Sequence, residues 1–395
     1  MRLIGVFSVL LVVLFNLNGQ MSTSFDKKEV LDMIQLCNSF TFIDLYGSDG
    51  EILPEGYKKH HTSGVFGMDN KYQIYTKEDK VIINLRGSTD KKESWLENFY
   101  SSMIPARSTI VIDGEPFDYA FAKNPTAAVH AGYTLAIGFL SKDILMHLKY
   151  LNKDGYYKII LTGHSQGGAL ANLLRAYLEN LPNEKFAEKN ELITYAFAAP
   201  MVGNSQFVQE YNNRYCSDGS SFNFTNPADP IPRFPMQSSD SSFNAQNIVN
   251  MIMNKESVDM SQLLAQGAMV LFEDQIKNLA TNMSNSTLKQ INKDIGNVQM
   301  PPYVDELGYH KISNQVRVIP VSYPKILTDS TILQNDSIMA IHKIGTDGHL
   351  DDEKFYDKQP WGYQHKPYNY YVAIMKMYFP EQYAVLEKKH LVENL

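Results

Sequence analysis

Residues 156–181 read YYKIILTGHSQGGALANLLRAYLENL, and the spacing of apolar residues changes halfway along this stretch. The apolar run over Lys158–Thr162 is typical of a strand buried on both faces, whereas leucines at helical spacing follow from Gly167 onward. Between them, residues 163–167 spell GHSQG, a G-x-S-x-G pattern with a strand before it and a helix after it. This order predicts a sharp strand-to-helix turn with Ser165 at its apex.

The residue types around Ser165 suit a nucleophile. A residue at the apex of so sharp a turn has a strained backbone, and side chains two positions away would collide, so glycine is expected at Gly163 and Gly167. Gly168 lets the helix pack close to the strand. The helix N-terminus directs its free N–H groups at the serine, which makes the Gln166 N–H a candidate oxyanion donor. Without this context, the same five residues would describe an ordinary glycine-rich turn.

The first twenty residues have the layout of a secretory signal. Arg2 precedes a largely apolar run over Leu3–Phe15, which is short for a membrane span. We expect residues 1–19 to be removed by cleavage after Gly19, so that the mature chain starts at Gln20 and is secreted or periplasmic. An uncleaved anchor or a buried helix is the alternative, and no later apolar stretch reaches the length of a membrane span.

Composition describes an ordinary globular protein. The 395 residues are 44% hydrophobic and 20% charged, and the formal net charge of −7 is spread without long acidic or basic runs. This pattern argues against nucleic acid as a partner. The two cysteines, Cys37 and Cys216, leave open one disulfide or two buried free thiols, and neither has a metal-ligand pattern beside it.

Short strands are predicted on both sides of the serine turn. Tyr72–Tyr75 and Val81–Leu85 are expected to form a hairpin, and Leu192–Phe197 and Ser221–Thr225 are spaced as further strands of a parallel sheet. Asp26–Ile43 has the spacing of an amphipathic helix over the edge of a core.

Six short motifs follow one another between Gly67 and Pro235. They are LRGST at 85–89, WLENF at 95–99, VHAGY at 129–133, GHSQGGALA at 163–171, APMVGN at 199–204 and NPADPIPR at 226–233. Together they resemble the ordered motif set of the class 3 lipases, the fungal-lipase-like branch of the α/β-hydrolases. The resemblance implies an α/β-hydrolase fold, with a mostly parallel central sheet flanked by helices. It also implies a family that contains secreted triacylglycerol lipases, phospholipases of the A1 type and feruloyl-type esterases.

The same resemblance suggests roles for individual residues. Ser88 falls on the family's first oxyanion position, where its backbone N–H would donate beside that of Gln166 and its hydroxyl could add a second contact. Asp229 follows a strand, where the acid of an α/β-hydrolase is found, and would orient the catalytic imidazole. His130 is similar to a structural histidine of the family. His164 is expected to point away from the neighbouring serine.

Three histidines compete for the role of base. His365, in GYQHKPYNYYVAI at 362–374, precedes a predicted C-terminal helix that runs to about Tyr378 and looks most like the family's terminal catalytic histidine. His349, in DGHLDD at 347–352, is the rival, although that stretch also has the oxygen-rich composition of a turn or a weak cation site. His342 is the third candidate.

The segment from about residue 237 to residue 300 departs from the simple family plan. Asn247–Met283 carries a helical stripe of apolar residues that includes methionines. One hypothesis is a helical cap over an acyl pocket, and the alternative is a helical layer that covers its own core. Residues 20–395 are therefore expected to form one α/β-hydrolase domain with a helical insertion after the Asp229 loop.

These observations predict a secreted serine hydrolase that cleaves carboxylic esters of lipids, as a triacylglycerol lipase or an A1-like phospholipase. The predicted triad is Ser165, Asp229 and His365, acting through an acyl-enzyme with Ser88 and Gln166 as the oxyanion hole. No metal or organic cofactor is required, and the expected partner is a lipid or other ester, met at a lipid–water interface. The alternatives are a soluble short-chain or feruloyl-type esterase and a catalytically inactive hydrolase fold used for binding.

Overall fold

A seven-stranded sheet forms the centre of the protein, for which the computed structural model describes residues 25–237, 270–271, 285, 287–305, 308–360 and 362–391. Its strands are Lys58–Thr62 (β1), Tyr72–Lys77 (β2), Lys80–Leu85 (β3), Lys158–His164 (β8), Glu191–Phe197 (β9), Ser221–Thr225 (β10) and Gln315–Arg317 (β14). The strand order is β1-β2-β3-β8-β9-β10-β14. β2 is antiparallel to β1 and β3, whereas the neighbours from β3 to β14 are all parallel. The predicted mostly parallel sheet is confirmed.

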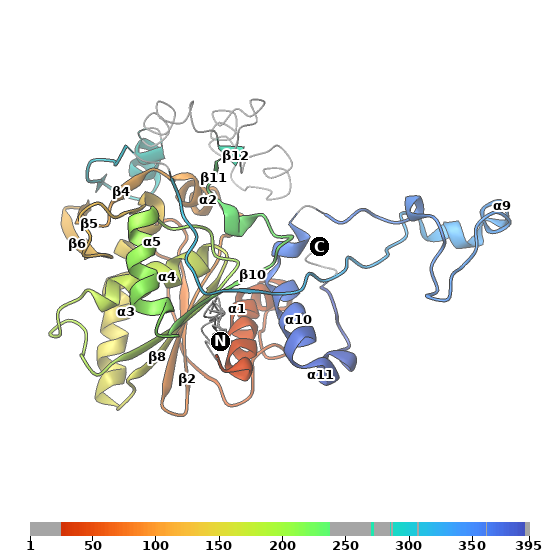
Figure 1. Ribbon diagram of the computed structural model, residues 1–395, viewed down its shortest axis with the longest axis horizontal. Helices are drawn as coiled ribbons and strands as arrows, with labels where there is room; N and C mark the ends of the chain where they lie inside the picture. Colours follow the sequence, from red (N-terminus) through yellow and green to blue (C-terminus); the bar gives the residue numbers. More distant parts are fainter. Residues whose placement is uncertain are drawn as a thin grey trace, which may run out of the picture.

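Helices cover both faces of this sheet (Figure 1). One face carries α3 (Ala131–Lys153), α4 (Gln166–Glu179) and α5 (Ser205–Tyr211), and the other carries α1 (Lys27–Tyr46) and α10 (Pro367–Tyr378). Alternate residues of a strand point to opposite faces, so Ile83 packs in the layer of α3 and α4 while Ile82 packs in the layer of α1 and α10. The core therefore consists of two apolar layers with the sheet between them.

Local sequence determines where the helices of the second face begin. The Asp26 side chain accepts hydrogen bonds from the N–H groups of Lys28 and Glu29 at the start of α1, and Gly47, with φ of 73°, ends that helix. α10 begins at Pro367, because proline is tolerated in the first helical turn, where an N–H would have no partner within the helix. This start places His365 two residues before the helix, with Lys366 between them.

A smaller antiparallel sheet lies beside α3 and is not among the elements predicted from the sequence. β5 (Arg107–Ile112) and β6 (Glu115–Ala120) form a hairpin, and β13 (Val298–Gln299) pairs with β5. Asp113 and Gly114 make the turn with φ of 50° and 85°. An Asp-Gly pair between two strand-like runs is a hairpin signal, so the turn was detectable in the sequence.

The remaining short elements connect these layers. They are α2 (Lys92–Phe99), β4 (Met103–Pro105) paired with β7 (Ala128–His130), β11 (Met236–Gln237) paired with β12 (Val270–Leu271), a π-helical turn at Asn212–Cys216, a 3₁₀ turn at Ile231–Arg233, and α11 (Pro380–Ala384). Among the described residues, no helix has the length and apolar character needed to cross a membrane.

An arm leaves the sheet after β14 and returns to α10 (Figure 1). It contains 3₁₀ turns at Ser330–Gln334 and Glu353–Phe355, and the one-turn helix α9 (Asp336–Met339). Its small apolar cluster consists of Ile332, Leu350, Phe355 and Tyr356, with partly buried neighbours. The sequence predicts one insertion, before residue 300, so this arm is an additional elaboration. Its few apolar residues cannot form another layer of the core.

Two predicted segments fall outside the part of the chain that the structure describes. The signal at residues 1–19 lies outside the described residues, and so does the cap at Asn247–Met283 apart from the short β12. Cys37 and Cys216 are both buried and free, so of the two alternatives the structure has unpaired thiols. Burial raises the pKa of each thiol to about 12.

Candidate active site

Ser165 sits at the apex of the turn between β8 and α4, with φ of 59° and ψ of −128°. This conformation is strained for a residue with a side chain. A Cβ atom on Gly163 would lie 2.4 Å from the backbone of Gly167, and a Cβ on Gly167 would lie 2.1 Å from the Leu85 carbonyl oxygen. Glycine is required at both positions, partly because of the neighbouring strand β3.

His365 bridges Ser165 and Asp229. Its Nε2 lies 2.8 Å from Ser165 Oγ, and its Nδ1 lies 2.8 Å from Asp229 Oδ2. All three residues are buried. Asp229 comes from the loop after β10, and His365 comes from the 3₁₀ turn Tyr363–His365. The structure thus brings together the three side chains that the sequence predicted as a triad, in an order that leaves Nε2 free to accept the serine proton.

Asp229 is held by three donors. Its Oδ2 accepts the Tyr370 hydroxyl at 2.8 Å as well as the imidazole, and its Oδ1 accepts the Ile231 N–H at 2.9 Å. The Tyr370 oxygen in turn accepts the Asn226 N–H at 2.9 Å. Tyr370 and Asn226 were not predicted as site residues, although both lie in the motifs that contain His365 and Asp229.

Asn226 also ties the acid loop to the histidine turn. Its Nδ2 donates to Gln364 Oε1 at 2.8 Å, and Gln364 precedes His365 in the chain. Gln364 Nε2 donates to the Val321 carbonyl at 2.8 Å. The positions of Asp229 and His365 are therefore coupled by side-chain hydrogen bonds besides the one between them.

The two rival histidines lie on the arm. His342 Nδ1 is 2.9 Å from Asp351 Oδ1, and the His349 ring packs edge-on against Tyr356 with 5.7 Å between ring centroids. In the described part of the chain, neither makes a contact with Ser165. The geometry therefore favours His365 as the partner of the serine.

The other two histidines of the motif set are structural. His130 caps α3: its Nδ1 accepts the Tyr133 N–H at 3.3 Å and its Nε2 donates to the Asn98 carbonyl at 3.2 Å. Burial lowers its pKa to about 3, which keeps the ring neutral. His164 is also buried, and its ring packs 4.7 Å from that of His365 instead of reaching the serine hydroxyl. Burial, reinforced by His365, holds the pKa of His164 well below its usual value.

The end of β3 lies against the serine turn. A Cβ on Gly87 would lie 2.8 Å from the His164 carbonyl oxygen, which places the next residue, Ser88, beside the nucleophile. The Ser88 hydroxyl donates to Gln166 Oε1 at 2.8 Å and accepts from Asn98 Nδ2 at 2.9 Å. In this conformation the hydroxyl proton holds Gln166, so the predicted second oxyanion contact from the hydroxyl requires that this hydrogen bond be exchanged.

The backbone N–H groups of Ser88 and Gln166 are the candidate oxyanion donors. Neither has a hydrogen-bond acceptor among the residues that the structure describes. Gln166 is the first residue of α4, where an N–H has no partner within the helix. These two amides can donate to an oxygen bound beside Ser165.

A buried polar network fixes the Gln166 side chain. Its Oε1 accepts from Ser88, from Asn98 Nδ2 at 3.1 Å and from the Ser94 hydroxyl at 3.2 Å. Its Nε2 donates to Glu97 Oε1, and Glu97 Oε2 accepts from Asn70 Nδ2 at 2.6 Å. Burial raises the pKa of Glu97 to about 8, against these hydrogen bonds, which lower it. Glu97 was missed as a site residue, although it lies within the WLENF motif.

We expect Glu97→Gln to change how stability depends on pH. Folding raises the pKa of Glu97 from its ordinary value of 4.5 to about 8, so between these values the folded state retains a proton that the unfolded state has lost. The free energy of unfolding therefore falls as pH rises through this window, by up to about 1.4 kcal/mol per pH unit. Urea unfolding at several pH values should show this contribution in the wild type and not in the variant.

The matched control is Glu93→Gln, on the same helix but only half-buried. It should keep the wild-type dependence on pH. If the free energy of unfolding depended on pH equally in the wild type and in Glu97→Gln, the pKa of Glu97 would be the same in the folded and unfolded states. That result would contradict the raised pKa of Glu97.

A narrow pocket with mainly apolar walls opens beside Ser165. It is lined by Ser88, Trp95, Asn98, Phe99, Ser165, Pro200, Ile231 and Phe234. Phe99 and Phe234 meet edge to face with 5.9 Å between ring centroids. Apolar walls next to the candidate nucleophile and the candidate oxyanion donors suit an apolar acyl group.

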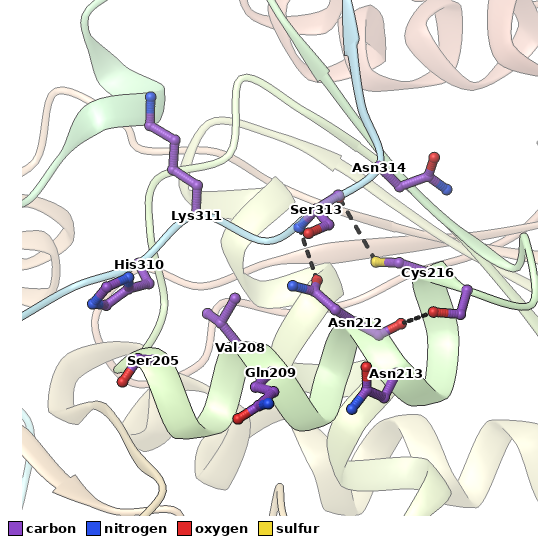
Figure 2. Close-up of a pocket in the computed structure, with 11 residues that line it drawn as sticks. Ser205, Val208, Gln209, Asn212, Asn213, Cys216, His310, Lys311, Ser313 and Asn314 are labelled. Carbon is purple, nitrogen blue, oxygen red and sulfur yellow. Dashed lines mark hydrogen bonds between the residues drawn. The ribbon is translucent and has the colours of Figure 1, made fainter. Parts of the chain in front are cut away.

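A separate pocket lies between α5 and residues 310–314 (Figure 2). Asn212 Oδ1 accepts the Ser313 N–H at 2.8 Å, and Cys216 Sγ lies 3.7 Å from the Ser313 carbonyl oxygen. Because burial raises the pKa of Cys216, its thiol stays protonated and is a poor nucleophile. The lining includes neither Ser165 nor His365, so the two pockets are distinct.

The mostly parallel sheet, with a serine on the sharp turn between a central strand and the following helix, defines an α/β-hydrolase fold. Residues 82–239 match the family model described as lipase (class 3). This part of the chain matches the class 3 lipase family, so the resemblance seen in its motifs is confirmed over these residues.

Similar proteins cover only part of the chain. A secreted mono- and diacylglycerol lipase A of Penicillium camembertii is 31% identical over 99 residues, which are 24% of this chain and 28% of that protein. A secreted mono- and diacylglycerol lipase 1 of Fusarium solani is 24% identical over 159 residues, 40% of this chain and 39% of that protein. The chain thus spans less than half the length of these relatives.

Solved structures of fungal lipases also resemble this chain. The triacylglyceride lipase of Rhizomucor miehei is 21% identical, with a TM-score of 0.40, over 53% of this chain and 74% of that one. Lipase II of Rhizopus niveus is 20% identical, with a TM-score of 0.40, over 53% of this chain and 75% of that one.

Proposed function

We propose that the protein is a carboxylic ester hydrolase that acts on lipid esters through Ser165, His365 and Asp229. The observation that carries this proposal is the His365 ring, which is hydrogen-bonded to Ser165 Oγ on one side and to Asp229 Oδ2 on the other. The family of residues 82–239 supports the same reaction class. Because the chain spans only part of its relatives, their activity supports the proposal without extending to the whole protein.

The proposed reaction proceeds through an acyl-enzyme. Ser165 Oγ attacks the ester carbonyl while His365 Nε2 takes its proton and then gives that proton to the leaving alcohol. Asp229 accepts the Nδ1–H and stabilises the imidazolium. The N–H groups of Ser88 and Gln166 donate to the oxyanion. Water, activated by His365, then releases the acid, so no step requires a metal or an organic cofactor.

The proposed substrates are acylglycerols or phospholipids. Apolar residues line the pocket beside Ser165, among them Trp95, Phe99 and Phe234, which suits a fatty acyl chain. The relatives that match the chain are named as mono- and diacylglycerol lipases, which supports glycerol esters. These relatives are also named as secreted, which agrees with the signal predicted at residues 1–19.

We expect the full chain to be labelled once, at Ser165, by a p-nitrophenyl phosphonate. Labelling requires an activated serine with an oxyanion hole, so it separates an enzyme from an inactive binding protein. Hydrolysis of emulsified long-chain mono-, di- and triacylglycerol and of phospholipid should then exceed that of a soluble butyrate ester or methyl ferulate. Peptide mass spectrometry and acid release measure the two results.

The outcomes separate the alternatives. Labelling with faster turnover of the soluble esters would favour a short-chain or feruloyl-type esterase over a lipase. A chain that is folded but not labelled would contradict catalysis and leave the binding-protein alternative.

A further inference from the structure

Three side chains with metal-binding atoms meet at the edge of the sheet next to α3. Asp143 and His147 are four residues apart on this helix, so they share one of its faces. His61 comes from the edge strand β1. One ligand atom from each of the three residues lies within 4.8 Å of the others. All three residues are partly exposed, so an ion can reach them from solvent.

An irregularity in β1 determines where His61 lies. Lys59 pairs with Tyr75 and His61 pairs with Ile74, so His60 is an extra residue in the ladder. Bulges of this kind change the direction of side chains at sheet edges. The result is a contact between the His61 and His147 rings, with 4.0 Å between their centroids.

The carboxylate of this group is oriented by a buried tyrosine. The Tyr72 hydroxyl donates to Asp143 Oδ2 at 2.6 Å, and Tyr72 is fully buried. Metal-binding carboxylates are typically held by an outer hydrogen bond of this type, which leaves the other oxygen available.

We propose that His61, Asp143 and His147 bind a divalent transition-metal ion of the Zn²⁺ type. Two imidazoles and one carboxylate are a ligand set that zinc accepts, with water in the fourth position. Bonds of about 2.0–2.1 Å in a tetrahedral site bring ligand atoms to within roughly 3.4 Å of one another, so the present spacing requires only side-chain rotations. The ion would join the edge strand β1 to α3. Its role is structural, because none of these residues belongs to the triad.

The test is a titration of the metal-free full chain with Zn²⁺, followed by calorimetry. We expect one site with a dissociation constant of about 1 µM, and a rise in Tm on addition of the ion. His147→Ala and His61→Ala should each weaken binding by at least about 100-fold and remove the rise in Tm. Co²⁺ should give the visible absorption of a tetrahedral nitrogen–oxygen site in the wild type and not in these variants.

Two further variants are controls, one for loss of the fold and one for Zn²⁺ binding at another place on the protein. Asp143→Asn retains an acceptor for Tyr72 but loses the charge, so it should weaken Zn²⁺ binding while keeping the far-ultraviolet spectrum and the Tm of the metal-free wild type. His349→Ala, on the arm, should bind Zn²⁺ as the wild type does. No binding by the wild type at millimolar Zn²⁺, or equal binding by the wild type, His61→Ala and His147→Ala, would overturn the proposal.

Discussion

Replacement of Ser165 by alanine is expected to lower the rate of ester hydrolysis by about 10⁵–10⁶-fold while the protein stays folded. The variant loses the attacking oxygen, and the N–H groups of Ser88 and Gln166 can still polarise a bound ester, so a small residual rate should remain. Stability should change little, because alanine keeps the Cβ atom and the same strained backbone angles. The measurements are kcat on one emulsified ester, phosphonate labelling and Tm.

The control for this experiment is Ser205→Ala, a serine that lines the pocket in Figure 2 and not the one beside Ser165. It should keep the wild-type rate and phosphonate labelling. Wild-type turnover by purified Ser165→Ala, with contamination excluded by a mock preparation, would refute the serine-hydrolase proposal.

Replacement of His365 by alanine is expected to lower kcat by several orders of magnitude, about 10⁴-fold or more. The reason is that Ser165 loses the acceptor 2.8 Å from its hydroxyl, and Asp229 loses its link to the reaction. His342→Ala and His349→Ala should each stay within about tenfold of the wild type, since both rings pack on the arm. Rates of all variants are compared at one pH.

The two arm variants also serve as matched controls, because each removes one imidazole at a distance from the serine. Tm of each variant shows whether the fold is intact, which matters because His365 is buried. A large loss of rate in His349→Ala, with His365→Ala still active, would mean that the arm closes over the site in the working enzyme.

The order of the central elements could be predicted from local sequence. Alternating or continuous apolar runs predicted β2, β3, β8, β9 and β10, and the glycines around Ser165 predicted the turn, because these patterns depend on residues near each other in the chain. The hairpin at Asp113-Gly114 was missed, although its turn signal is equally local.

Contacts between residues of the candidate site could not be predicted from local sequence. The chemistry of Ser165, Asp229 and His365 is visible in their motifs, yet Asp229 and His365 are 136 positions apart, and only the fold shows that His365 rather than His349 reaches the serine. Only the fold likewise shows that Glu97 accepts a hydrogen bond from the Gln166 side chain and that Tyr370 donates one to Asp229. Their roles arise from burial and hydrogen bonds that no local pattern encodes.

The sequence by itself determined the strand-to-helix turn, the order of the motifs and the residue types of a serine hydrolase, since backbone strain and side-chain periodicity act over a few residues. Only the tertiary structure decided which histidine meets Ser165, that the Ser88 hydroxyl holds Gln166, and that Cys37 and Cys216 remain free. It also decided that His61 meets Asp143 and His147. Such contacts depend on how strands and helices pack across the sheet, which brings together residues far apart in the chain.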